Sequence, residues 1–186
     1  MIKNLHNKLF CAGVTLFIGS ITPLGVLSIQ AQAHQDQHLK TSTVDKEAML
    51  AHQLMVGEGV KIDQQKAFAL IQTSYKHDSP YGKYLYSRYL IGKKEPERAK
   101  KMMADALTKI LPSAQAGDPF AQYTIGVIHH LGLGVQPNMQ QAAEWYTKAV
   151  ENNVPSAMNN LAGLYLRGEG VEKDVKKEVQ LLMRAA

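Results

Sequence analysis

A short Gly-x-Gly-Val motif occurs three times along the chain. It reads GEGV at residues 57–60, GLGV at 132–135 and GEGV again at 168–171. The last two copies lie 36 residues apart, and the residues around them also match in size at this offset, as Ala121 matches Ala157. Internal similarity at such a period is typical of helical repeat proteins, in which each repeat is one supersecondary unit that stacks on the next.

Each copy of the motif stands between two segments that have the spacing of amphipathic helices. Around the second copy, residues 119–131 and 139–152 carry apolar side chains at intervals of three and four, which is the period of one helix face. In all three copies an Asn or Asp precedes the second segment, where its side chain can accept a hydrogen bond from a backbone N–H group; these residues are Asp63, Asn138 and Asp174. The motif therefore follows a helix, whereas a dinucleotide-binding loop follows a strand.

A less regular copy lies between the first motif and the second. The sequence PYGKY at 80–84 aligns with PFAQY at 119–123, but the corner glycines are missing. Pro96 suits the first position of a helix, and the helix after it, at about 97–111, is expected to be longer than its counterparts. We therefore predict four repeats over residues 46–186, at 46–81, 82–120, 121–156 and 157–186.

These repeats resemble the Sel-1-like repeat family, a relative of the tetratricopeptide repeat. The resemblance rests on AQYTIG at 121–126, GLGV at 132–135 and AAEWYTKA at 142–149, and it extends over nearly all of residues 46–186. It implies an all-α fold, a right-handed superhelical solenoid of about four helix-turn-helix repeats, with a concave face that binds a partner. The structural repeat positions are Gly57, Gly59, Gly132, Gly134, Gly168, Gly170, Trp145 and Tyr146.

The N-terminal segment has the order of regions that a secretory signal peptide shows. Two lysines precede an uncharged, mostly apolar run over residues 9–29, and the small-residue sequence Ala-Gln-Ala follows. We expect a signal peptide at 1–33 that is cleaved after Ala33, a flexible segment at 34–45, and a periplasmic or secreted mature chain without stable membrane insertion. The alternative is that the apolar run is kept as a membrane anchor.

Charge and motif content disfavour several functions. The net charge of the chain is +5, and two of its lysines belong to the predicted signal peptide. The rest is only mildly basic, so we expect no nucleic-acid partner. The sequence lacks Ser-x-x-Lys, Gly-x-Ser-x-Gly and His-Glu-x-x-His, which are signatures of common hydrolases. We therefore predict that the chain is not an enzyme, with no catalytic residue, no metal and no cofactor.

Stacked helix pairs create an extended surface, which is a physical reason to expect a binding partner. Together with the family resemblance, this predicts a non-catalytic protein–protein interaction module or adaptor in the bacterial cell envelope. Its partner would be another envelope protein or peptide, bound on the concave face. The alternative is an enzyme of the Sel-1-like repeat type that binds or hydrolyses β-lactams or acts on the cell wall.

The concave face is expected to carry those residues of each first helix that point away from the core. Tyrosine and arginine are favoured among them because they combine contact area with directional hydrogen bonds. For Tyr84 and Arg88, packing between repeats is an equally good interpretation. The predicted binding residues are His52, Tyr84, Arg88, Tyr123, His130 and Asn159.

The last residues, QLLMRAA at 180–186, have the pattern of a second helix without a capping helix after it. Solenoids usually need a polar cap at an open end. Leu181, Leu182 or Met183 would then leave an apolar edge, so we expect self-association through the C-terminal end.

Overall fold

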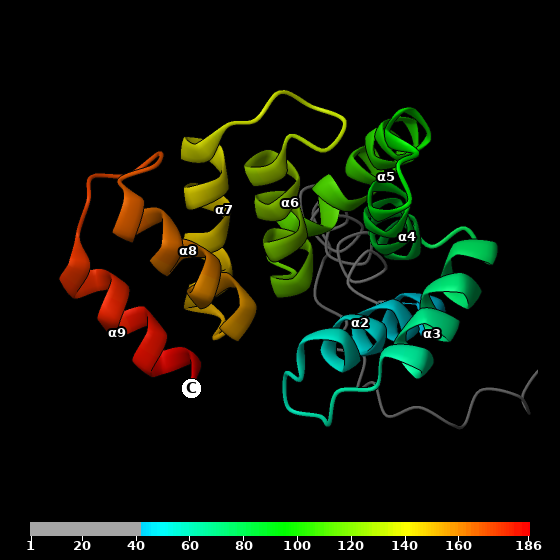
Figure 1. The fold of residues 1–186 in the computed structure, drawn as a ribbon, viewed down its shortest axis with the longest axis horizontal. Helices are drawn as coiled ribbons and strands as arrows, with labels where there is room; N and C mark the ends of the chain where they lie inside the picture. The colour runs from blue at the N-terminus through cyan, green and yellow to red at the C-terminus, as the bar shows by residue number, and fades with distance from the viewer. Residues whose placement is uncertain (1–41) are drawn as a thin grey trace, which may run out of the picture. The chain divides into compact units, whose positions relative to one another are not determined.

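The structure is a computed structural model, and it describes residues 42–186. These residues form eight α-helices and no β-strand, which confirms the predicted all-α fold (Figure 1). The predicted signal peptide at 1–33 and residues 34–41 lie outside the described residues. The helices are α2 (Thr43–Val56), α3 (Gln64–Lys76), α4 (Pro80–Gly92), α5 (Pro96–Gln115), α6 (Pro119–Leu131), α7 (Met139–Glu151), α8 (Pro155–Arg167) and α9 (Val175–Ala185).

The helices are arranged as four pairs: α2 with α3, α4 with α5, α6 with α7, and α8 with α9. Each second helix also contacts the first helix of the next pair, which makes the arrangement a solenoid. The first helices of pairs two to four begin two residues before the predicted repeat starts, each with a proline in the first turn. Helix α2 begins at Thr43, three residues before the predicted start, because the side chain of Ser42 accepts a hydrogen bond from the N–H of Asp45.

Within the described residues of 42–186, no helix is both long enough and apolar enough to cross a bilayer.

The predicted helix starts after the glycine corners are confirmed. The side chains of Asp63, Asn138 and Asp174 each accept a hydrogen bond from a backbone N–H group in the first turn of the helix that follows. A cap of this kind contributes about 1 kcal/mol to helix stability. The three second helices therefore begin at equivalent positions, which keeps the repeats in register.

Helix α5 is longer than its counterparts, as predicted, but it does not end before Pro112. A proline inside a helix removes one backbone hydrogen bond and usually ends or kinks the helix. Here α5 continues to Gln115, and Ala114 in its last turn is buried at 1% exposure. The side-chain amide of Gln122 donates a hydrogen bond to the carbonyl of Ala114, so contacts with α6 stabilise this extra turn.

One continuous core runs through all four pairs, from Ala48 in α2 to Leu181 in α9. Tyr146 lies at its centre with 0% exposure, and burial of such a side chain contributes about 1.5–3 kcal/mol. It packs directly on Gly126 of α6, where an added Cβ atom would lie 2.5 Å from the Tyr146 ring. Gly126 thus leaves the space that the Tyr146 ring occupies. Trp145, the neighbouring repeat residue, is only partly buried against this core.

The second glycine of a corner packs on the preceding helix pair. This holds for Gly134 and Gly170, whose preceding pairs are among the described residues. A Cβ atom added to Gly134 would lie 2.9 Å from the Lys100 carbonyl oxygen in α5. At Gly170 it would lie 2.2 Å from the backbone carbonyl carbon of Met139 in α7. Gly59 occupies the equivalent corner of the first pair, and no described residue lies within 4 Å of its added Cβ. The glycines therefore allow backbone-to-backbone contact between successive pairs.

The tightness of this contact can be measured by comparing two alanine substitutions. Gly59→Ala and Gly170→Ala each place a methyl group on a left-handed backbone, with φ of 70° and 69°. Each should therefore lose about 1–2 kcal/mol to the same backbone strain. Only Gly170→Ala also forces a methyl group against Met139, which should cost about 1–3 kcal/mol more. Urea unfolding should show this excess, and equal losses for the two variants would contradict the close approach.

Candidate binding surface

The first helices of the four pairs, α2, α4, α6 and α8, carry all six predicted binding residues. These helices also contact one another, α2 with α4 and α6 with α8. We call the side of the molecule that they share the first-helix face. The six residues differ widely in exposure, because some of them fill the space between neighbouring first helices.

His52 of α2 is buried at 3% exposure, so it lies inside the first-helix face and not on its surface. Its ring lies 5.1 Å from the ring of Tyr123 and 5.4 Å from that of Phe120, both in α6. Burial, together with the positive charge of Arg88, lowers the pKa of His52 to about 4. His52 is therefore neutral near pH 7, and among the described residues its Nδ1 atom has no hydrogen-bond partner.

Tyr84, Arg88 and Tyr123 form the middle of the same cluster. Tyr84 has 0% exposure and Tyr123 has 5%. The Arg88 guanidinium donates a hydrogen bond to the Tyr84 hydroxyl at 3.1 Å, and the nearby Tyr84 and Tyr123 hydroxyls keep the pKa of Arg88 above its usual value. The two tyrosines thus pack between first helices. For Tyr84, the sequence had left both partner binding and packing between repeats open, and the structure shows packing. Arg88 is half-buried and keeps some access to solvent.

A polar contact links the first pair to the fourth through this cluster. Ser156, at the start of α8, donates a hydrogen bond of 2.9 Å to Glu58 in the corner after α2. The Ser156 hydroxyl also lies 3.3 Å from Nε2 of His52. A serine–histidine–acid triad needs the acid on the far nitrogen of the histidine. Here Glu58 lies 3.8 Å from the same Nε2 atom that faces the serine, so the arrangement holds helices together and does not activate the serine.

The first-helix face becomes accessible toward its α8 end. Asn159 of α8 is equivalent to Tyr84 and Tyr123 in the repeat, but it is exposed. His130, the penultimate residue of α6, is half-buried and lies 3.2 Å from the Tyr146 hydroxyl. Leu166, the equivalent of His130 in α8, is 43% exposed. Asn159, Leu166 and His130 together are named the α8 patch.

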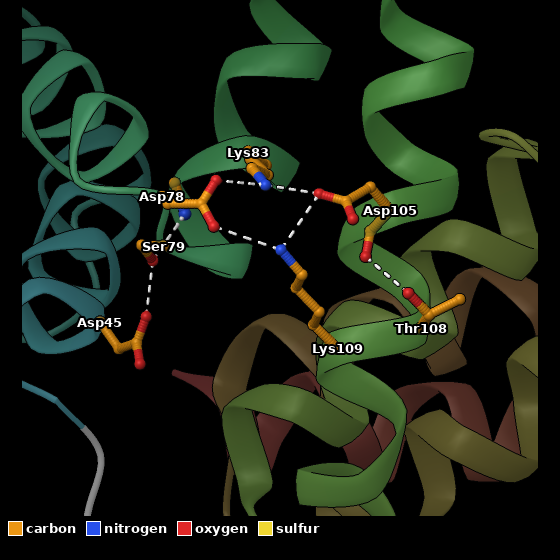
Figure 2. Close-up of polar contacts among 8 residues, drawn as sticks. Asp45, Asp78, Ser79, Lys83, Asp105, Thr108 and Lys109 are labelled. Carbon is orange, nitrogen blue, oxygen red and sulfur yellow. Dashed lines mark hydrogen bonds and ion pairs between the residues drawn. The ribbon is translucent and has the colours of Figure 1, made fainter.

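A second polar cluster joins the first two pairs. Lys83 of α4 and Lys109 of α5 each lie between the carboxylates of Asp78 and Asp105, as Figure 2 shows. The hydrogen bond from Lys83 lowers the pKa of both aspartates. The side chain of Lys83 is 13% exposed, whereas that of Lys109 is 43% exposed. Both cations already have acidic partners, so we interpret the cluster as a structural contact between helices and not as a site for a charged ligand.

The model of the Sel1 repeat matches three segments of the chain, at residues 47–79, 119–154 and 155–185. These segments cover more than half of the chain. The chain belongs to the Sel1 repeat family. The unmatched second pair is the one that lacks the corner glycines, and the structure shows that it still forms a helix pair of the same kind.

Three curated Sel1 repeat relatives are similar to this chain over part of its length. It is 38% identical over 90 residues to the chitin synthase regulator SKT5 of Saccharomyces cerevisiae, which is 48% of this chain and 13% of that protein. It is 35% identical over 74 residues to chitin synthase regulatory factor 3 of Schizosaccharomyces pombe, which is 39% of this chain and 8% of that protein. It is 38% identical over 58 residues to HRD3A, an ERAD-associated E3 ubiquitin-protein ligase component of Arabidopsis thaliana, which is 31% of this chain and 9% of that protein. The chain thus spans at most 13% of the length of these relatives.

Two solved structures also align with this Sel1 repeat chain. A protective antigen of uropathogenic Escherichia coli that displays an SLR fold is 20% identical, with a TM-score of 0.46, over 82% of this chain and 32% of that one. A Sel1 repeat protein from Oxalobacter formigenes is 26% identical, with a TM-score of 0.42, over 87% of this chain and 44% of that one.

The sequence alone did not identify Ser156 or Glu58 as residues that hold the first-helix face together. Ser156 belongs to no motif, Glu58 occupies the variable position of the first Gly-x-Gly-Val motif, and the two residues lie 98 positions apart in the chain. Asp78, Lys83 and Asp105 were also missed, because their contacts join separate segments of the chain. The local signal for Asp78 was weak: it lies in the turn between α3 and α4 with a φ of 61°, a conformation in which Asp and Asn are enriched.

The burial of His52 predicts a specific loss of stability in acid. Its pKa is about 4 in the folded chain and 6.5 in the unfolded chain, so the unfolded state binds more protons between these values. Stability is therefore full above pH 6.5 and falls as the pH drops toward 4, by about 2 kcal/mol between pH 7 and pH 4.5 for this group. Urea unfolding at the two pH values should show the loss. His52→Gln should reduce the pH dependence, and a His52→Gln profile identical to that of the parent would contradict this prediction.

The second polar cluster predicts unequal effects of its two lysines. Lys83→Gln removes the less exposed cation from two carboxylates and should lower the free energy of unfolding by about 1 kcal/mol. Lys109→Gln removes a solvent-screened cation and should change stability by less than the error of urea unfolding. Addition of 0.5 M salt should weaken the Lys109 contacts first. A larger loss for Lys109→Gln would show that Lys83 is not the principal cation of the cluster.

Proposed function

We propose that this chain is a non-catalytic protein–protein interaction module of the bacterial cell envelope, and that its partner is a protein or peptide that docks on the α8 patch of the first-helix face. The names of the relatives support the general class. Two are regulators of an enzyme and the third is a component of a ligase, and each name describes work with another protein. The envelope location rests on the signal-peptide pattern of residues 1–33.

The observation that carries the proposal is the change in exposure along equivalent positions of the first helices. The position is filled by a fully buried tyrosine in α4, a 5% exposed tyrosine in α6, and an exposed asparagine in α8. The buried residues fix how the first helices lie, so they cannot touch a partner. The α8 patch combines an exposed apolar side chain, an amide and a half-buried histidine, a mixture that suits a protein surface.

Substitutions at the buried residues of the first-helix face do not test binding. Tyr84→Ala would remove a fully buried aromatic side chain, which typically costs about 3–5 kcal/mol, so lost binding would only report unfolding. Arg88→Glu would place a carboxylate beside the Tyr84 hydroxyl, so a loss of binding could again result from a loss of stability. Substitutions at exposed members of the α8 patch avoid it.

A photo-crosslinking side chain at Asn159 should trap the partner in intact cells. The matched control carries the same side chain at Glu144, an exposed residue of α7. We expect one protein on Asn159 and not on Glu144, with mass spectrometry to identify it. Leu166→Arg should reduce the trapped product by about tenfold or more, whereas Ile62→Arg, at another exposed apolar residue, should not. Equal trapping at both positions, or no effect of Leu166→Arg, would overturn the proposed surface.

A further inference from the structure

Arg88 of α4 is the only half-buried arginine in the described part of the chain. Arg98, Arg167 and Arg184 are exposed. The first two each pair with a glutamate, and the third donates hydrogen bonds to a backbone carbonyl and an amide oxygen. No carboxylate of the described residues forms an ion pair with Arg88. A cation that is partly removed from water gains from an acidic partner, and the described residues do not supply one.

The Arg88 guanidinium keeps donors that are unpaired and accessible. Its Nη1 atom donates a hydrogen bond to the Tyr84 hydroxyl at 3.1 Å, whereas its Nε and Nη2 atoms have no hydrogen-bond partner among the described residues. The buried side-chain nitrogen and oxygen atoms that lack a partner in residues 42–186 belong to His52 and Thr124 and not to Arg88. The Nε and Nη2 donors of Arg88 therefore remain within reach of solvent or of a ligand.

The helices around Arg88 carry no acid of their own. Helices α4, α6 and α8 contain no aspartate or glutamate. The other cations on them, Lys83 and Arg167, pair with acids from other elements. The nearby Glu58, in the corner after α2, already accepts the hydrogen bond from Ser156. The first-helix face thus holds one cation that is not neutralised, and the complementary ligand is an anion.

The repeat relates the position of Arg88 to the α8 patch. Arg88 follows Tyr84 by one helical turn, and the equivalent residues of α8 are Asn159 and Gly163. Between them, in α6, the equivalent of Arg88 is Val127, which is 4% exposed. Neither Val127 nor Gly163 has a charge that would repel an anion. A peptide that covers Asn159 can therefore follow equivalent positions of the repeat toward Arg88.

We propose that Arg88 binds a carboxylate of the partner, from an aspartate or glutamate side chain of a peptide that also covers the α8 patch. This inference rests on the proposed function, because it names the chemistry of the same partner. The N–H groups on Nε and Nη2 point in parallel from one edge of the guanidinium, and a carboxylate accepts such a pair with both of its oxygens. The bond from Nη1 to Tyr84 holds the opposite side of the guanidinium in place.

Substitution of Arg88 in the Asn159 crosslinking experiment tests this contact in the full chain. Arg88→Gln removes the charge and keeps an N–H donor for the Tyr84 hydroxyl, and the trapped product should fall by about tenfold or more. Arg88→Lys keeps the charge without the paired donors and should also trap less than the parent. Arg98→Gln, at an exposed arginine of α5, is the matched control and should trap as much as the parent. Equal trapping by Arg88→Gln and the parent would overturn the inference and leave the proposed function intact.

An acidic peptide tests the site without the natural partner and without a substitution that could unfold the chain. The probe is acetyl-Gly-Glu-Glu-Gly-amide, and acetyl-Gly-Gln-Gln-Gly-amide is the neutral control. NMR spectra of the purified protein follow the Nε–H signals of the arginines, and Arg88→Gln identifies the signal of Arg88. We expect the acidic peptide to shift this signal progressively and the neutral peptide to leave it in place. No shift would overturn the inference, and so would equal shifts of Arg88 and the exposed arginines, which would show only general attraction.

The same spectra separate this inference from its two alternatives. Asp36 is the only acidic residue before residue 42. Asp36→Asn should leave the Arg88 signal in place, and a shift would reveal a partner within the chain and overturn the inference. A shift of the Arg88 signal by the acidic peptide, with no protein trapped at Asn159, would support the carboxylate site and reject the α8 patch as the docking surface.

Discussion

The close approach of backbone to backbone at the glycine corners is the constraint on which the rest of the structure depends. Gly134 and Gly170 let the loop of one pair rest directly on the second helix of the pair before it. A side chain at either position would hold successive pairs apart. Protein interiors have little spare volume, so such a shift would propagate through the first helices. The capped helix starts then fix the register within which this contact repeats.

The first-helix face shows how one repeat position can serve two purposes. In α4 and α6 the position is a tyrosine that packs between neighbouring helices, with Arg88 to satisfy a hydroxyl. In α8 the same position is an exposed asparagine. The cost of enclosing polar aromatic groups is offset by hydrogen bonds within the cluster, since an unpaired buried polar group costs about 1–3 kcal/mol. The result is a face that is rigid along most of its length and open at one end.

The fold could be predicted from the sequence because its determinants are local. The glycine corners, the Asn and Asp caps and the apolar period all lie within a few residues of the structure that they determine, and the helix bounds at 119–131 and near 139–152 agree with α6 and α7. The extent of α5 could not be predicted in this way, because the turn beyond Pro112 depends on a hydrogen bond from Gln122 in the next helix.

The exposure of the candidate site residues could not be predicted either, because it also depends on contacts between helices that are distant in the sequence. Whether His52 or Tyr123 faces solvent depends on how helices from different pairs approach one another, and no local pattern encodes that distance. Asn159 and Leu166 are therefore residues of this face that a partner can reach, and the buried tyrosines are not.

The contact of Ser156 with Glu58 and His52 has a consequence for how the chain folds. In an ideal solenoid each repeat touches only its neighbours, so stability is a sum of nearest-neighbour terms and the ends can fray independently. Here the fourth pair contacts the first over 98 and 104 positions of sequence. Loss of either terminal pair would leave polar groups of the other without partners, which couples the two ends thermodynamically. The four pairs should therefore unfold as one cooperative unit, and the folding rate should be limited by closure of this long-range contact.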